Sequence, residues 1–392
     1  MNYENLFSSV QRASGLRLRL RLQPMYGAGE IVFPCTVAGG KYLTAPRRIP
    51  GYHESIDCTT LDSVQSQANR MEAVLLEDIR SGNLSLPHIE TDFSDVDGLE
   101  KPVGKITCFD APHRVFDAII RDSVDEKGTH FPFTGSGKAA IDATSRNATA
   151  LLSLSPSSLL FGSWDSTGVS GGLGEKYARC VVSEIVAVNS KIGGREGVRA
   201  DPLNSSGDVD CVKIAETEKY DIWKNRQAKT KKDKNRASAI NHGNIVWDAH
   251  GGVTCDYIQQ SITISFPALR QLRFPVEGKD EADTSAKGQA VLAAIALHAA
   301  ALNVERGWHL RSRCDLVLDD GVVPEWEILG GASSKAALTA GETRKILKKA
   351  IEEAKAAGLP WNDEPVRLKP SQALAKLVVA SQKAHRESTT EA

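Results

Sequence analysis

The fold is indicated by a run of seven residues, Leu16-Arg17-Leu18-Arg19-Leu20-Arg21-Leu22. Leucine and arginine alternate at a period of two, and a β-strand points successive side chains to opposite faces of its sheet. The run therefore predicts a strand with its leucines on the core and its arginines outward. The arginines form either a solvated sheet face or a surface that meets a polyanion such as RNA.

Further periodic segments predict the rest of the core. Apolar residues from Val64 to Ile79 form one stripe, which predicts a helix that Asp62 caps and that ends near Arg80. A second helix is expected from about Ala286 to Arg306, and strands are expected at 181–188, 261–266 and 309–318. The order strand, helix, strands, helix, strand suits an α+β core of the ferredoxin-like (RRM-like) kind with long insertions.

Residues 331–392 are predicted to form a helical extension of a core that spans residues 1–330. Thr339 and Glu342 form a capping-box pattern, and Gly358 and Pro360 end the helix that follows. A second helix is expected from about Gln372 to 385. The extension is expected to pack either on the core or on a neighbouring subunit.

Composition limits the class of protein and its partners. Hydrophobic residues make up 41% of the chain and charged residues 25%, which is typical of a soluble globular protein, and the formal net charge is −1. A nucleic-acid site must therefore come from local clustering of cations. Such clustering occurs in the insertion 199–250, where seven lysines and arginines between Lys224 and Arg236 share thirteen positions with a single acid, Asp233. This run of cations is either a solvated charge cluster or a binding segment. A second long insertion is expected at residues 83–105 and is polar.

Cysteine usage and the N-terminal sequence predict a cytoplasmic protein. The seven cysteines are dispersed, and no pair has the C-x-x-C spacing of zinc sites, so reduced thiols are expected. The first residues carry no signal-peptide pattern. The longest apolar run, from Ala290 to Leu302, is too short to span a bilayer and predicts a buried helix, so no membrane is expected as a partner.

Two glycine- and serine-rich segments lie between Phe131 and Arg179. One is Phe133-Thr134-Gly135-Ser136-Gly137-Lys138, and the other runs from Gly162 through Ser166 and Gly172 to Lys176. Glycine lets the backbone approach a ligand closely and lysine favours an anion, so both segments are candidates for phosphate binding. Glycine-rich turns of an ordinary domain are the alternative.

Neither segment matches an enzyme motif. A phosphate loop needs glycine where Pro132 stands and a hydroxyl where Ala139 stands. A nucleophile elbow around Ser166 needs glycine where Trp164 stands. A nucleotide-binding enzyme that uses Gly135 to Lys138 is therefore disfavoured.

The order of short segments resembles the CRISPR-associated RAMP backbone subunit of type I-G (formerly I-U) Cascade complexes. The matching segments span roughly positions 15 to 330 and are Arg47 to Pro50, Ser63 to Glu72, Ala111 to Arg114, Phe131 to Phe133, Ser155 to Trp164, Ile240 to Ile245, Gly251 to Thr254 and Leu310 to Leu316. The resemblance implies an RRM-like RAMP core with large insertions. It also implies a thumb-like segment that crosses the guide RNA onto the next copy, and residues 199–250 are the candidate for it.

The resemblance further implies the partners. They are the guide crRNA, other copies of the same subunit in a helical filament, other Cascade subunits, and target DNA bound through the guide. Sequence specificity would then belong to the guide rather than to the protein.

RNA binding of this kind needs cations for phosphates and aromatic or hydroxyl groups for riboses and bases. The residues expected to contact RNA are Arg47, Arg48, His53, Gly135, Gly137, Lys138, Ser163, Trp164, Ser166, Gly172, Lys176, Arg179, Lys229, Lys231, Lys232, Lys234, Asn241, His242, Arg311 and Arg313. Each is alternatively a surface or structural residue, and Trp164 in particular is alternatively a core anchor.

No catalytic residue, metal ligand or cofactor is expected, and the chain is expected not to be an enzyme. Asn241 and His242 suit a phosphate or ribose contact, or a turn, better than a general base. The alternative is a metal-dependent RNA endonuclease on the same fold, with Asp165 or Asp201 as its acid.

Overall fold

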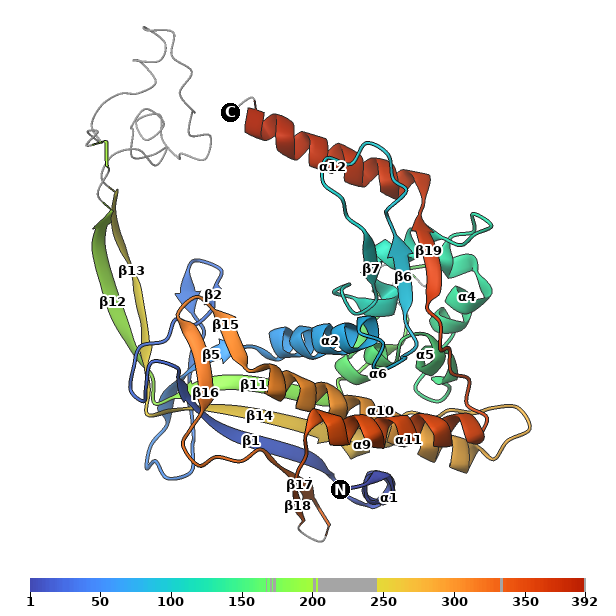
Figure 1. Ribbon diagram of the computed structural model, residues 1–392, viewed down its shortest axis with the longest axis horizontal. Helices are drawn as coiled ribbons and strands as arrows, with labels where there is room; N and C mark the ends of the chain where they lie inside the picture. The colour runs from blue at the N-terminus through green and yellow to red at the C-terminus, as the bar shows by residue number, and fades with distance from the viewer. Residues whose placement is uncertain are drawn as a thin grey trace, which may run out of the picture.

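The structure is a computed structural model that describes residues 1–166, 168–169, 171, 174–199, 202–203, 245–331 and 334–390. Within these residues the chain is a mixed α+β protein built on one curled antiparallel sheet (Figure 1). Seven strands follow the order β15 (Trp308–Arg311), β16 (Cys314–Leu318), β1 (Gly15–Pro24), β14 (Tyr257–Ser265), β11 (Val181–Val188), β5 (Ile56–Asp62) and β4 (Thr44–Arg47). Two more, β17 (Glu325–Leu329) and β18 (Lys335–Ala337), join at the side of β1.

Strand β1 lies at the centre of the sheet and confirms the prediction from its alternating sequence. Leu16, Leu18, Leu20 and Leu22 are all buried, while the arginines between them face outward. One half of β1 pairs with β17 and the other half pairs with β16, on the same side of the strand. Because the neighbouring strand changes along the length of β1, the sheet curls there.

Helices cover the leucine face of the sheet. They are α1 (Tyr3–Arg12), α2 (Val64–Arg80), α9 (Phe266–Arg270), α10 (Glu281–Arg306) and α11 (Ala340–Ala356). Of the helices in the described residues, α10 is the one long and apolar enough to cross a membrane by length and composition, yet 83% of its apolar window is buried in the protein. The prediction of a buried helix here is therefore confirmed.

A polar cluster inside the helical layer joins three of these helices. His298, which interrupts the apolar run of α10, is fully buried and lies 3.0 Å from the Asp78 carboxylate of α2 and 3.0 Å from Thr343 Oγ1 of α11. Arg344 donates to the same carboxylate at 2.8 Å. Burial lowers the pKa of His298. Leu347 and Ala350 of α11 belong to the same hydrophobic core as the leucines of β1, so α11 packs on the core rather than apart from it.

Residues 84–180 are inserted between α2 and β11 and form a lobe together with β19 (Val366–Pro370) from the C-terminal part of the chain. The lobe has a small sheet of β7 (Lys105–Thr107), β6 (Ile89–Asp92), β19 and β8 (Ser123–Val124), in that order. Its short helices are η1 (Arg114–Phe116), α3 (Ala118–Arg121), η2 (Phe131–Phe133), α4 (Gly135–Ile141), α5 (Thr149–Leu154) and α6 (Pro156–Phe161), and its two remaining strands are β9 (Ser163–Trp164) and β10 (Lys176–Tyr177). The C-terminal helix α12 (Gln372–Thr390) lies across this lobe, where Gln382 exchanges two hydrogen bonds with the backbone of Lys101.

The structure corrects three local predictions. Helix α2 is capped by Ser63, whose Oγ accepts from Ser66 N at 3.3 Å, while Asp62 is the buried last residue of β5. Residues 309–318 form a hairpin of β15 and β16 rather than one strand, because Arg313 adopts the left-handed conformation, with φ of 60°, at the turn. Phe266 begins helix α9 instead of ending β14.

The ion pairs of Glu353 give a pH-dependent prediction for the docking of α11. Lys287 Nζ and Lys349 Nζ lie 2.8 and 2.9 Å from its carboxylate, and these hydrogen bonds lower the pKa of Glu353 to about 2. A lowered folded-state pKa means that the stabilisation is present above the ordinary value of 4.5 and is lost as the pH falls toward 2. We expect Glu353→Gln to lower the free energy of unfolding at pH 7 by about 0.2–1 kcal/mol, because the pair is half-exposed.

Urea denaturation of Glu353→Gln and wild type between pH 3 and pH 7 measures this effect. The difference between the two proteins should narrow as the pH falls. Glu352→Gln is the matched control, since Glu352 is more exposed and lies 3.9 Å from Lys349. A difference of equal size at pH 3 and pH 7 would contradict the assignment.

Candidate nucleic-acid interface

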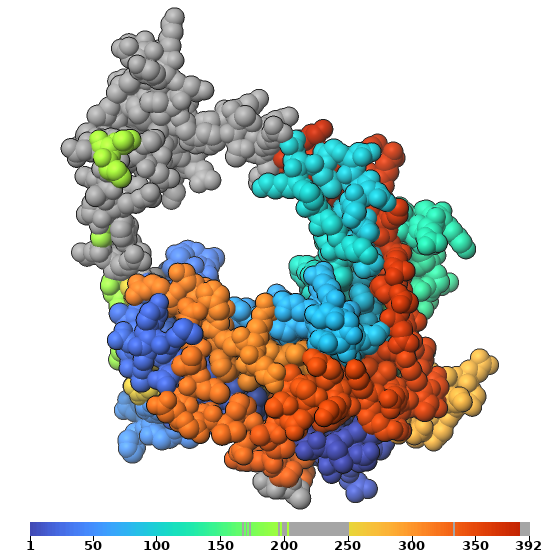
Figure 2. Space-filling model, viewed as in Figure 1, coloured from blue at the N-terminus to red at the C-terminus, as the bar shows by residue number. Residues whose placement is uncertain are grey.

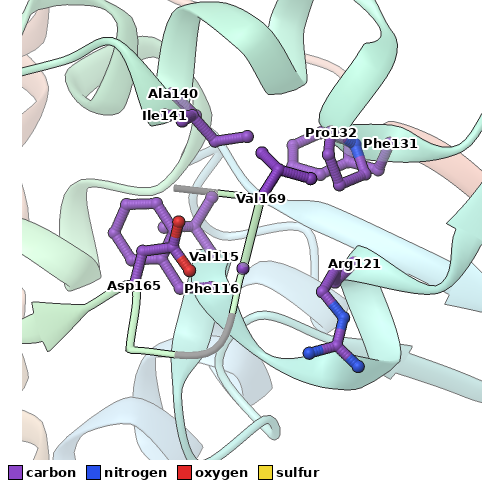
Figure 3. Close-up of a pocket in the computed structure, with 10 residues that line it drawn as sticks. Val115, Phe116, Arg121, Phe131, Pro132, Ala140, Ile141, Asp165 and Val169 are labelled. Carbon is purple, nitrogen blue, oxygen red and sulfur yellow. The ribbon is translucent and has the colours of Figure 1, made fainter. Parts of the chain in front are cut away.

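The two glycine-rich segments, predicted as phosphate-binding loops, lie against each other in the lobe. Residues from 131–141 and 165–169 line one cavity together with Val115, Phe116 and Arg121 (Figure 3). Its volume is about 20 Å³, which is room for one water molecule. Asp165 and Arg121 supply its charged groups, and Asp165 is buried. The segments therefore enclose a small, mostly apolar cavity that has no room for a nucleotide.

Gly137 has a packing role, which corrects the expectation that glycine there admits a guide backbone. It lies in the first turn of α4, where its N–H donates to Thr134 Oγ1 at 3.0 Å. It is buried, and a Cβ at this position would overlap the carbonyl oxygen of Phe131. The close approach is thus made by the protein's own chain. Gly135 and Lys138 of the same segment are exposed, and Gly172 lies outside the described residues.

Strands β9 and β10 form a two-stranded ribbon that carries an exposed aromatic ring beside cations. Trp164 is 45% exposed, so it is not a core anchor, and Lys176 Nζ lies 5.4 Å from the centre of its ring. Arg179 is exposed just beyond β10. Exposed rings stack on bases and neighbouring cations bind phosphates, so this ribbon has the groups that single-stranded RNA requires.

The hydroxyl groups of the ribbon are less available than its ring and cations. Ser163 Oγ donates to the carbonyl of Ser158 at 3.2 Å, and Ser166 is half-buried. Of the residues that the sequence predicted here, Trp164, Lys176 and Arg179 are the exposed ones.

Arg114 holds the ribbon in place. In the sequence, Arg114 belongs to the family segment Ala111 to Arg114, but the sequence assigns it no role. Its Nε and Nη2 donate to the two carboxylate oxygens of Glu72 on α2 at 2.7 and 2.6 Å. Its Nη1 donates to the carbonyl of Gly162 at 2.8 Å, one residue before β9. Both partners of the ion pair are buried, and burial raises the pKa of Glu72 to about 7 even though Arg114 opposes the shift. Arg114 thus fixes the start of the ribbon to the helix beneath it.

The arginines predicted from the first family segment lie at the edge strand β4. Arg47 makes a bidentate pair with Glu184 of β11, both distances being 2.8 Å, and this pair raises the pKa of Arg47. Its guanidinium is therefore committed to the protein. Arg48 and His53 are exposed on the loop that joins β4 to β5 and are open to a ligand.

Arg311 and Arg313 lie on the β15–β16 hairpin and differ in role. Arg311 donates to the carbonyl of Leu61 at 3.3 Å and lies 3.9 Å from Asp62, which binds it to the end of β5. Arg313 is exposed at the turn, and its guanidinium stacks 4.3 Å above the ring of Phe33. Arg313 is the member of this pair whose charge faces solvent.

The outward arginines of β1 are largely neutralised within the protein. Arg17 lies 2.7 Å from Glu327, and Arg21 lies 3.7 Å from Asp319 and stacks 3.9 Å above Tyr257. Arg19 between them is exposed. The open sheet face therefore has mixed charge, which favours the interpretation of a solvated face.

A two-stranded arm continues the central hairpin of the sheet. Strands β12 (Lys191–Arg199) and β13 (Ile245–Thr254) pair with Lys191 opposite Thr254. In the sheet, Val188 of β11 is opposite Tyr257 of β14, three residues away along each strand, so the two pairings share one register. The arm is thus an extension of β11 and β14 away from the core (Figure 1).

The base of the arm is held from two sides. Asp256 accepts hydrogen bonds from Tyr52 Oη at 2.6 Å and from Asn189 Nδ2 at 2.9 Å, and the bond to Tyr52 raises the pKa of that hydroxyl to about 12. On the other side, Val32 and Val253 exchange backbone hydrogen bonds at 3.0 and 2.8 Å. These contacts anchor the arm at its root.

Glycines mark the point where the arm leaves its root. The register shifts between Ile192 and Gly194, which is a β-bulge. A Cβ on Gly251 would overlap the carbonyl oxygen of Gly194, and Gly252 has φ of 90°. Glycine is favoured at the first position because it has no Cβ, and at the second because other residues rarely adopt this positive φ. The predicted thumb segment 199–250 lies mostly beyond this point, and Lys229, Lys231, Lys232, Lys234, Asn241, His242 and Asp201 are outside the described residues.

An open hollow lies between the arm side of the molecule and the lobe. The arm and α12 with β6 and β7 rise on either side of it in Figure 1, with α2 beneath. Figure 2 shows the open space between the blue and orange segments around β2 (Thr36–Val37) and β15 and the cyan and red surface of the lobe. The β15–β16 hairpin, whose turn contains Arg313, lies at the arm side of this space in Figure 1.

The described residues offer little for a metal-dependent reaction. They hold no group of three or more His, Cys, Asp or Glu side chains placed to bind a metal ion. Asp165, the candidate acid for an endonuclease, is buried beside the small cavity of Figure 3. It is therefore not placed to meet an RNA strand in this structure.

Comparison with known protein families finds a similar family. Residues 16–191 match the family described as CRISPR-associated protein GSU0053. The matched segment is thus similar to a CRISPR-associated protein family. It runs from β1 through α2 and the lobe to β11 and ends at the first residue of the arm. No curated protein matches the chain. The family supports a CRISPR-related role, as the resemblance in the sequence implied.

Proposed function

We propose that this chain is a crRNA-binding backbone subunit of a type I-G CRISPR effector (Cascade) complex and is not an enzyme. Copies of the chain would line the guide RNA in a helical filament and contact other Cascade subunits. The guide would present its bases to target DNA, and the complex would act in the cytoplasm without a cofactor. The CRISPR-associated family of residues 16–191 supports this proposal at its coarsest level.

The topology agrees with an RRM-like core. Strand β1, helix α2, strands β11 and β14, helix α10 and strand β16 follow the β-α-β-β-α-β order of ferredoxin-like folds. The strands β16, β1, β14 and β11 are neighbours in the sheet, with β5 and β4 added beyond β11. The lobe is then an insertion between the first helix and the second core strand, and the arm is an insertion in the hairpin that follows.

The observation that carries the proposal is the arm. Its root continues the central hairpin in the same register and is anchored there, and the arm extends away from the core beside an open hollow. The residues between its two strands contain the lysine run of the sequence. An anchored extension that carries cations suits a segment that crosses a phosphate backbone.

Co-purification tests the proposal. When the chain is expressed beside a CRISPR array, small RNA of defined length should co-purify with it. Binding to unrelated single-stranded RNAs should be similar in strength and should fall with salt at a log–log slope of about −0.7 for each phosphate contact. Absence of bound RNA, or a strong preference for one short sequence with little salt dependence, would reject the proposal.

A further inference from the structure

A second groove lies on the side of the molecule away from the hollow. It is formed between helix α1 and the β17–β18 hairpin and has a volume of about 590 Å³. Figure 1 places α1 and this hairpin at the lower edge of the molecule, whereas the arm and α12 are at the upper edge. None of the residues predicted from sequence to contact RNA lines this groove.

One wall of the groove is the polar face of α1. Asn5, Ser8, Ser9 and Arg12 recur at spacings of three and four residues, which places them on one face of the helix. The opposite face, which includes Leu6, is buried in the core. Seven residues of rise along a helix correspond to about 10 Å, so this wall is longer than a single phosphate group.

The other wall is the β17–β18 hairpin, which adds Ser334 and Lys335. The residues that line the groove include two cations and no acid. Arg12 is exposed and has no ion pair within the described part of the chain. Lys335 is 61% exposed and lies 3.8 Å from Glu325, which is a weak contact at this exposure. The groove therefore has a cation on each wall, beside amide and hydroxyl side chains, of which Ser9 Oγ already donates to the carbonyl of Asn5 at 2.7 Å.

We propose that this groove binds a phosphodiester strand as a second nucleic-acid site, separate from the path of the guide. Arginine, lysine and hydroxyl or amide side chains make most contacts to nucleic-acid phosphates, and these groups line both walls. The alternative is that Arg12 stabilises the dipole of α1 from the C-terminal end of the helix. This alternative explains Arg12 alone. It does not account for Lys335 on the facing hairpin or for the absence of acids from the lining.

The test uses the chain with its co-purified guide RNA, titrated with fluorescein-labelled oligo(dT) and oligo(rU) at several salt concentrations. The variant is Arg12→Ala with Lys335→Ala, and the control is Lys345→Ala with Lys348→Ala on α11, which also removes two exposed lysine charges. We expect the double variant in the groove to weaken oligonucleotide binding and to reduce the magnitude of the log–log salt slope by about 1.4, for two phosphate contacts. The control should leave both unchanged.

Further readouts separate the alternatives. Thermal melting checks that the variant is folded, and the amount of guide RNA that co-purifies should stay at the wild-type level. An unchanged salt slope overturns the proposal, as does a loss of guide RNA in step with the loss of oligonucleotide. Binding of pyrophosphate without binding of either oligonucleotide also overturns it, because the ligand would then be a free anion. If no guide co-purifies, the free chain is titrated in the same way, so the groove is tested even when the proposed function fails.

Discussion

Replacement of Arg114 by alanine is expected to lower the free energy of unfolding by about 3–5 kcal/mol. The Arg114 side chain is 8% exposed and the Glu72 side chain 2% exposed, so removal of the guanidinium leaves a buried carboxylate without its partner. The Gly162 carbonyl loses its hydrogen bond in the same substitution. Chemical denaturation in urea measures the loss.

Two further variants define the cause. Arg80→Ala is the matched control, because Arg80 lies on the surface of α2 and is 3.8 Å from Asp110, and its effect should stay below about 1 kcal/mol. Arg114→Lys keeps the charge but cannot make the bidentate contact, so its effect should be intermediate. A loss from Arg114→Ala no larger than that of Arg80→Ala would show that the buried pair does not stabilise the fold.

Substitution of Arg114 is also expected to affect RNA binding, because Arg114 holds the β9–β10 ribbon. Arg114 fixes the residue before β9, and Trp164 lies two residues after Gly162. In Arg114→Lys, guide retention should therefore fall with the order of the ribbon even where the protein stays folded. In the proposed function Arg114 is a positioning residue for Trp164 and Lys176, because it contacts Gly162 and Glu72 rather than RNA.

Removal of the arm is expected to abolish guide retention while leaving the core intact. The strand pairing at the root permits a clean deletion, in which Asn-Gly replaces residues 194–251 and joins the two strands by a tight hairpin turn. The backbone pair of Val32 and Val253 and the hydrogen bonds of Asp256 are kept. Because the arm extends away from the core in Figure 1, the melting temperature should change little.

A milder variant separates charge from shape. Alanine at Lys229, Lys231, Lys232 and Lys234 keeps the arm but removes four cations, and Lys345→Ala with Lys348→Ala serves as the control for surface charge. Retained RNA is measured after purification at fixed salt, and circular dichroism reports the fold. Wild-type guide retention by the arm deletion would remove the main support for the proposed function. If guide RNA is lost from the arm deletion but retained by the four-lysine variant, binding depends on the shape of the arm rather than on these lysines.

Local sequence alone was sufficient for the regular elements of the core. The alternation of leucine and arginine predicted β1 correctly. The apolar stripe from Val64 to Ile79 predicted the extent of α2, and only the capping residue was wrong. The capping box of Thr339 and Glu342 is present as predicted at the start of α11. These features follow from side chains a few residues apart, so their periodicity is readable without the fold.

Contacts between distant residues were decided by the tertiary structure. Sequence suggested phosphate loops in the segments of Gly137 and Ser166, but these segments meet each other around one small cavity. The Arg114–Glu72 pair, the register that joins the arm to the sheet, and the groove between α1 and the β17–β18 hairpin each bring together residues far apart in the chain. Glycine, arginine and serine have the same local signature whether they meet a ligand or their own protein. Which of these they meet depends on packing between segments that no local pattern encodes.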